Sequence, residues 1–160
     1  MTREDYIGRY ERVVRECTKG TGLFASLMMA QAILESSDKH GVPGNSTLAR
    51  LYNNHFGIKA DKSWTGKKVN LQTREVFDNK DVMVGDYFRI YDEAEQSFKD
   101  RIQFLVRNKR YANAGVFVAK TPEDQAKALK AAGYATDPEY AKILQSLIVK
   151  LNLIELDNQA

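Results

Sequence analysis

The hydrophobic pattern of the chain changes period twice, from helical spacing to strand-like runs and back to helical spacing. In the first part, apolar residues recur every three or four positions over Tyr6–Cys17 and Leu23–Ser36, which predicts two helices. Ser46 can cap a third, short helix that ends at about Leu51. Because Cys17 falls on the apolar stripe of the first helix, we expect it to be a buried, unreactive thiol.

The middle of the chain, about residues 56–91, has a different pattern. β-Branched and aromatic residues occur there in short runs, and polar breaks at residues 78–81 and 85–86 predict antiparallel turns between the runs. This segment is therefore predicted to form a small antiparallel β-lobe inserted among helices.

Helical spacing returns in the second half of the chain. One helix is predicted over Ala94–Arg107, a second begins at Thr121 and stops at Gly133, and a third begins at Asp137. Both later starts combine a capping side chain with a following proline, which is typical of a helix amino terminus. The pattern predicts a single α+β domain over residues 1–160 that is mostly helical.

Composition and charge exclude several classes of protein. With 43% hydrophobic and 28% charged residues, the 160-residue chain is typical of one globular domain and not of a disordered or fibrous protein. There are 24 Lys and Arg residues and 21 Asp and Glu residues, which gives a net charge of +3. Because the two signs are interspersed along the chain, we expect no nucleic-acid partner. The single cysteine excludes an internal disulfide.

The sequence shows no membrane or export segment. No apolar run approaches about 18 residues, and the amino terminus alternates charges where a secretory signal would be apolar. We therefore expect no membrane span, and the route of export stays open. We also expect the protein to be a monomer.

The strongest chemical candidate is Glu35, a carboxylate at the carboxyl end of an apolar helical segment that begins at Ser26. The helix dipole and the apolar neighbours both disfavour the charged form, so the pKa of Glu35 should be raised. A carboxylic acid that keeps its proton near neutral pH can protonate the oxygen of a departing sugar, as glycosidases require. Taken alone, the position of Glu35 is more often that of an ordinary surface glutamate.

Short motifs over most of the chain resemble one known family. The matching segments are Ala30–Ser36, Gly44–Ala49, Asn53–Lys59, Trp64–Gly66, Val69–Glu75, Phe88–Tyr91, Arg110–Ala112 and Gly133–Pro138. In this order they resemble the glucosaminidase domains of peptidoglycan hydrolases, glycoside hydrolase family 73, from about residue 5 to residue 152. The sequence departs from the family pattern in the longer loop Ser37–Pro43 that follows the catalytic motif.

The resemblance implies a lysozyme-like fold that cleaves the β-1,4 glycan of bacterial cell walls between N-acetylglucosamine and N-acetylmuramic acid. It implies three roles: Glu35 matches the general acid of the family, Glu75 matches the β-lobe carboxylate proposed as the second catalytic group, and Tyr134 matches a tyrosine that lines the cleft. The partner would then be the glycan strands of peptidoglycan, and the site of action would be the cell wall, in the periplasm or outside the cell.

The role of the second carboxylate and the exact activity stay open at this point. Carboxyl groups about 5–5.5 Å apart would make Glu75 a nucleophile, a gap of about 6.5–9.5 Å would let it activate a water, and the acetamide of the substrate is another nucleophile. An N-acetylmuramidase, a lytic transglycosylase or a non-catalytic glycan-binding domain could be built on the same scaffold.

Other residues of the matched motifs are candidate substrate contacts. They are Gln31, Ser46, Asn54, Phe56 and Trp64. Amides and hydroxyls suit sugar hydroxyls and acetamides, and aromatic rings can stack on sugar faces. His55 has no acidic partner at the spacing of a zinc site, so we expect no metal, and the hydrolysis requires no cofactor.

Overall fold

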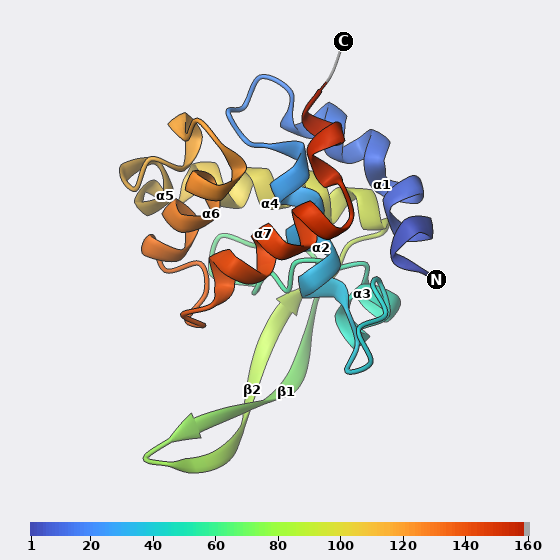
Figure 1. The fold of residues 1–160 in the computed structure, drawn as a ribbon. Helices are drawn as coiled ribbons and strands as arrows, with labels where there is room; N and C mark the ends of the chain where they lie inside the picture. The colour runs from blue at the N-terminus through green and yellow to red at the C-terminus, as the bar shows by residue number, and fades with distance from the viewer. Residues whose placement is uncertain (159–160) are drawn as a thin grey trace.

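The computed structural model describes residues 1–158, apart from the side chains of residues 73–77. In chain order the elements are α1 (Arg3–Thr18), α2 (Ala25–Ser36), α3 (Thr47–Tyr52), β1 (Lys68–Phe77), β2 (Lys80–Arg89), α4 (Ala94–Arg107), α5 (Lys109–Asn113), the 3-10 helix η1 (Val116–Val118), α6 (Pro122–Ala131), α7 (Tyr140–Lys150) and the 3-10 helix η2 (Leu153–Asp157). The helices form a body from which the two strands project as a long arm (Figure 1). This is the mostly helical architecture with antiparallel strands that the sequence predicted.

Helix α2 lies at the centre of the helical body, crossed by α7 (Figure 1). It packs against α1, α6, α7 and η2, and its residues Leu27, Met28, Met29 and Ile33 are at most 2% exposed. A helix that is apolar on all sides is stable when its neighbours cover every face, and each large buried side chain contributes roughly 1.5–3 kcal/mol. Glu35 is the one charged residue of this helix.

Local capping explains the limits of two other helices. Helix α4 spans the predicted range Ala94–Arg107. At the start of α6, the Thr121 hydroxyl accepts a hydrogen bond from the backbone N–H of Asp124 at 3.1 Å, and Pro122 occupies the first helical position. Both features were predicted from the capping sequence alone, because a cap needs only residues within one turn.

The predicted start of the last helix at Asp137 is wrong by three residues. The side chain of Asp137 accepts a hydrogen bond from the backbone N–H of Glu139 at 2.8 Å, which closes a turn, and α7 begins at Tyr140. Aspartate followed by proline is common both in turns and at helix starts, so the sequence alone did not distinguish the two structures.

The arm is one hairpin in which β1 and β2 pair antiparallel along their whole lengths. Its turn consists of Asp78 and Asn79, which have φ angles of 50° and 63°. Positive φ at both positions is typical of the type I′ hairpin turn, and Asp and Asn tolerate that conformation.

The second predicted turn, at Gly85, is wrong. Gly85 lies within β2, opposite Gln72. A Cβ atom at Gly85 would approach the side-chain oxygen of Asn70 to 2.9 Å and the side-chain nitrogen of Gln72 to 3.0 Å. The glycine thus lies where side chains of the facing strand approach the backbone closely, and it does not mark a reversal of the chain.

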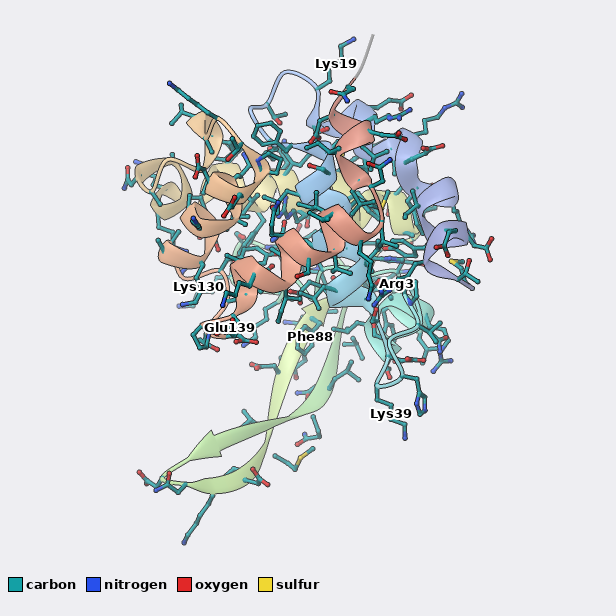
Figure 2. All side chains as sticks on the ribbon, viewed as in Figure 1. Arg3, Lys19, Lys39, Phe88, Lys130 and Glu139 are labelled. Atoms are coloured by element: carbon teal, nitrogen blue, oxygen red, sulfur yellow. The ribbon has the colours of Figure 1, made fainter. Side chains whose placement is uncertain are left out.

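The base of the arm is joined to α4 by a buried polar network. Arg89, the last residue of β2, is 1% exposed, and its Nη1 lies 2.8 Å from the carboxylate of Asp100 in α4. The Arg89 Nε donates to the carbonyl of Lys59, and the Tyr91 hydroxyl donates to the same Asp100 carboxylate. Phe88 is buried where the arm meets the body (Figure 2). These contacts hold the hairpin against the helices at one end.

A second buried polar pair lies between α1 and the loop after α3. The Tyr6 hydroxyl and the His55 Nδ1 are 2.7 Å apart, and both residues are at most 2% exposed. Burial lowers the pKa of His55 to about 4. The imidazole is therefore neutral at physiological pH, and its Nδ1 accepts a hydrogen bond from the Tyr6 hydroxyl.

This pair predicts acid sensitivity of the fold. The unfolded chain takes up a proton at His55 near pH 6.5 and the folded chain only near pH 4, so the free energy of unfolding should fall between these values by about 3 kcal/mol. Urea unfolding at several pH values would measure this slope, which H55N should flatten and the control H40N, at an exposed histidine, should leave unchanged. An unchanged slope in H55N would contradict the assignment.

Candidate active site

Glu35 occupies the last turn of α2, where the helix leaves the core and its side chain is half-buried. The hydroxyl of Tyr140, in α7, lies 3.4 Å from Oε1 of Glu35. Gln31 is one helical turn before Glu35 on the same face, and its Nε2 donates to the Tyr140 hydroxyl at 2.8 Å. The Tyr140 hydroxyl thus accepts one hydrogen bond from Gln31 and can donate another to the Glu35 carboxyl group.

The environment changes the acidity of Glu35. Burial raises its pKa, while the hydrogen bond from Tyr140 and the positive charge of Arg101 act in the opposite direction. The net shift is upward, which is the direction predicted from its place at the end of an apolar helix. Glu35 therefore keeps its proton to higher pH than an exposed glutamate.

Glu35 lies in the wall of a pocket of about 680 Å³. The pocket is lined by Leu34, Glu35, Phe56, Gly57, Ile58, Lys59, Asp61, Phe104, Arg110, Tyr111, Gly133, Tyr134, Ala135, Thr136, Asp137, Tyr140 and Ile143. These residues come from the end of α2, the loop before the arm, α4, α5, the α6–α7 connection and α7. The volume is within the usual range of small-molecule sites.

One side of the pocket is aromatic. The Tyr134 ring lies 6.1 Å from the ring of Tyr111, in an edge-on arrangement, and 6.0 Å from the ring of Tyr140. Phe56 lines the same pocket from the loop before the arm. Three of the predicted site residues, Glu35, Phe56 and Tyr134, therefore come together in one place.

Sequence reasoning missed two residues of this site. Neither Tyr140 nor Arg101 was among the predicted site residues. Arg101 is 1% exposed, and its guanidinium carbon lies 5.4 Å from the centre of the Phe56 ring and 5.6 Å from that of Tyr134. The sequence did contain a signal for Arg101, because it lies three residues after Phe98 on the apolar stripe of α4. A charged residue is rarely buried there unless it has a partner or a function.

Asn54, a predicted substrate contact, serves the scaffold instead. Its Nδ2 donates to the carbonyls of Ile58 at 3.0 Å and Arg89 at 2.9 Å, and its Oδ1 accepts from the backbone N–H of Ile58. The side chain is 1% exposed and does not line the pocket. Its amide joins the loop before the arm to the end of β2.

The remaining predicted contacts lie outside the pocket lining. The Trp64 indole donates to the carbonyl of Lys67 at 2.8 Å, and its ring stacks over the guanidinium of Arg89 at 4.8 Å. The Ser46 hydroxyl caps α3 by accepting from the backbone N–H of Ala49 at 3.1 Å. Gln31 is fully buried behind Tyr140.

The side chain of Glu75 lies outside the described residues. Its backbone belongs to β1 and pairs with Val82 in the outer half of the arm. The arm begins next to the pocket, because the backbone N–H of Ala60 donates to the carbonyl of Tyr87 at 2.9 Å and Lys59 bridges to Phe88.

Other chemistries find little support in the part of the chain that the structure describes. Burial raises the pKa of the half-buried Cys17 to about 11, so its thiol is not ionised at neutral pH. Among the described residues, no three His, Cys, Asp or Glu side chains are grouped so that they could hold a metal ion. Within the same residues, every helix is too short or too polar to span a lipid bilayer.

Comparison with known proteins gives a consistent result. The sequence model of the glucosaminidase family, described as mannosyl-glycoprotein endo-β-N-acetylglucosaminidase, matches residues 11–153. The chain is 38% identical over 143 residues to the peptidoglycan hydrolase FlgJ of Vibrio parahaemolyticus serotype O3:K6, covering 89% of this chain and 46% of that protein. It is 34% identical over 161 residues to a probable N-acetylmuramidase of Lactococcus lactis subsp. lactis, covering 96% of this chain and 35% of that protein.

The fold has a close solved counterpart. The catalytic domain of the autolysin Auto from Listeria monocytogenes superposes with a TM-score of 0.81 at 31% identity, covering 97% of this chain and 87% of that one. The lysozyme-like α+β class predicted from the sequence is thereby confirmed. The chain spans less than half of the length of the two curated relatives. With a family match over most of its length and this agreement in fold, the chain belongs to the glucosaminidase family, glycoside hydrolase family 73.

Proposed function

We propose that this domain hydrolyses the β-1,4 glycosidic bonds of peptidoglycan between N-acetylglucosamine and N-acetylmuramic acid, with Glu35 as general acid. The observation that carries the proposal is a half-buried carboxyl group with a raised pKa in the wall of an aromatic pocket of about 680 Å³. A sugar alkoxide is a poor leaving group, and a positioned acid that is still protonated near neutral pH removes that barrier.

The hydrogen bonds around Glu35 suit this role. Tyr140 faces Oε1 at 3.4 Å, which leaves Oε2 of Glu35 to carry the proton toward the glycosidic oxygen. As the proton is transferred, the bond between that oxygen and the anomeric carbon breaks, and Glu35 becomes a carboxylate that accepts the Tyr140 hydrogen bond more strongly. A water molecule then completes the hydrolysis at the anomeric carbon.

We assign the sugar contacts to the aromatic residues of the pocket. Phe56 and Tyr134 both line it, and aromatic faces pack against the apolar faces of pyranose rings. Gln31, Asn54, Ser46 and Trp64 lie outside the pocket lining and are not proposed to touch the substrate. We expect the domain to act as a monomer at the cell wall.

Glu75 stays the proposed second carboxylate. Its strand starts beside the pocket, and the arm is held to α4 at its base. A carboxylate on such an arm can reach a bound glycan if the arm bends over the pocket. Its distance from Glu35 in a glycan complex would decide between nucleophile and water activation.

A second candidate function is N-acetylmuramidase activity, which the name of the Lactococcus lactis relative favours. A muramidase would use the same acid and differ in which sugar occupies the subsite before the cleaved bond. The same scaffold could also serve a lytic transglycosylase or a glycan-binding domain without catalytic activity.

Product analysis separates these functions. Purified peptidoglycan is digested, the fragments are reduced with borohydride, and the sugar at each reduced end is identified by mass spectrometry. We expect N-acetylglucosaminitol. Reduced N-acetylmuramic acid would instead assign a muramidase, and 1,6-anhydro ends a transglycosylase. Binding to the glycan with no released fragment between about pH 4 and pH 9 would contradict an enzymatic role.

A further inference from the structure

The buried guanidinium of Arg101 is not explained by packing alone. Arg101 is 1% exposed, and its Nε and Nη2 have no hydrogen-bond partner. Within the described part of the chain, no carboxylate lies within ion-pair distance of it, whereas Arg89, the other large buried arginine, is paired with Asp100. Removing a cation from water is strongly unfavourable unless an opposite charge or aromatic faces compensate.

Arg101 lies behind the pocket wall. Its guanidinium carbon is 5.4 Å from the centre of the Phe56 ring and 5.6 Å from that of Tyr134, and both rings line the pocket. The Tyr134 ring is in turn 6.0 Å from the ring of Tyr140, whose hydroxyl faces Glu35. Arg101 is thus connected to Glu35 through the aromatic residues of the same pocket.

We propose that Arg101 is a positioning residue of this site: its guanidinium holds the rings of Phe56 and Tyr134 by cation–π contact and supplies the positive charge that stabilises the Glu35 carboxylate once its proton has left. The inference rests on the proposed role of Glu35 as the acid. Arg101 makes no contact with the substrate in this proposal. The pKa of Glu35 then depends on the charge of Arg101 in α4 as well as on the position of Glu35 in α2.

The physical argument concerns charge during proton transfer. Glu35 begins neutral and ends negative, so a fixed positive charge nearby favours the end state over the start. Arg101 is 1% exposed and Glu35 is half-buried, so their interaction is screened less than one between two surface charges. Consistent with this, Arg101 opposes the effect of burial on the pKa of Glu35.

Three other ionisable groups that interact with Arg101 have their pKa raised by burial. They are Tyr134, Tyr140 and Cys17, and the pKa of Cys17 is raised to about 11. The charged and titratable groups that line the pocket besides these are Lys59, Asp61, Arg110, Tyr111 and Asp137. These five residues are unchanged in the variants below, so a difference between variants reports the charge at residue 101.

The decisive variant is R101M, which keeps the apolar part of the side chain and removes the charge. Glutamate labelled with ¹³C at the carboxyl carbon gives the pKa of Glu35 by NMR, with the Glu35 signal identified by its absence in E35Q. We expect the pKa of Glu35 to rise by about 1 unit in R101M, since a nearby opposite charge typically shifts a carboxyl by about 1–3 units. The alkaline limb of the kcat profile should move to higher pH by the same amount, while the maximum kcat falls.

Two further variants separate charge from structure. R101K keeps the positive charge and should restore the alkaline limb to within a few tenths of a pH unit of the wild type. R15M removes an arginine from α1 whose Nε is likewise buried without a partner but which does not line this pocket, and it should leave both readouts unchanged. If R101M does not fold, the comparison of R101Q with R101K tests the same charge.

The outcomes are distinct. A folded R101M or R101Q with the wild-type pKa of Glu35 would overturn the proposal, as would R101K behaving like R101M. The NMR titration needs no catalysis, so it tests the influence of Arg101 even if the proposed function fails. Failure of the proposed function would be seen separately, as full hydrolytic activity in E35Q.

Discussion

Replacing Glu35 with glutamine is expected to lower the rate of peptidoglycan hydrolysis by about 1,000-fold. The amide has nearly the shape of the protonated carboxyl group and can still face Tyr140, which lies 3.4 Å from Oε1 in the wild type. It has no acidic proton to give to the leaving sugar, and general acid catalysis typically contributes about 100- to 10,000-fold. Release of soluble muropeptides, followed by chromatography under initial-rate conditions, measures the loss.

Two controls show that such a loss is chemical. E123Q, at an exposed glutamate of α6 that pairs with Lys127, should keep full activity. E35Q itself should be more resistant to thermal unfolding than the wild type above neutral pH, because it removes a partly buried group whose ionised form is disfavoured by burial. That difference should shrink as the pH falls through the ordinary glutamate pKa of about 4.3, below which the carboxyl is protonated in both the folded and the unfolded chain. Wild-type turnover in E35Q would refute the assignment of the acid.

Replacing Asp100 with alanine is expected to destabilise the domain by about 3–5 kcal/mol. Arg89 is 1% exposed, and its shortest contact with a carboxylate is the one to Asp100 at 2.8 Å. Truncating one member of a buried ion pair leaves the other charge buried and poorly compensated, which is far more costly than losing the pair as a whole. The carboxylate contact that remains to Arg89 is the longer one to the exposed Asp61, at 3.5 Å. The Tyr91 hydroxyl loses its acceptor in the same variant. For a domain of this size, the melting temperature should fall by about 10 °C.

A matched surface pair provides the control. Asp86 in the arm pairs with Lys59 at 3.1 Å, but the lysine side chain is 63% exposed. D86A should therefore change the stability by less than about 1 kcal/mol. The double variant R89M/D100L, which replaces the buried pair by apolar side chains, should recover much of the stability lost in D100A. Equal melting temperatures for D100A and the wild type would contradict the view that this pair anchors the arm.

The features that sequence predicted well depend on neighbouring residues. The cap of α6 at Thr121 and the full range of α4 follow from capping and from the spacing of apolar residues, which act within one or two turns. The turn at Asp78 and Asn79 is local in the same sense, since its conformation is determined by the two residues that form it.

The features that sequence missed depend on contacts across the chain. Gly85 was taken for a turn, whereas it lies within β2 under side chains of the opposite strand. Strand alternation could not decide whether Arg89 pointed to solvent or to the interior. Only the packing of the arm base against α4 places it beside Asp100.

For the candidate site, the sequence by itself determined the chemical character of one residue, a carboxyl group at the end of an otherwise apolar helix. It also indicated the family to which the protein belongs. Its surroundings depend on the tertiary structure, because Tyr140 lies 105 positions away in the chain and Arg101 belongs to a different helix. Local spacing cannot specify which distant side chains converge, since that depends on how whole helices pack. The same packing left Asn54 and Trp64 in the scaffold and brought Arg101 behind the pocket, against the rings of Phe56 and Tyr134.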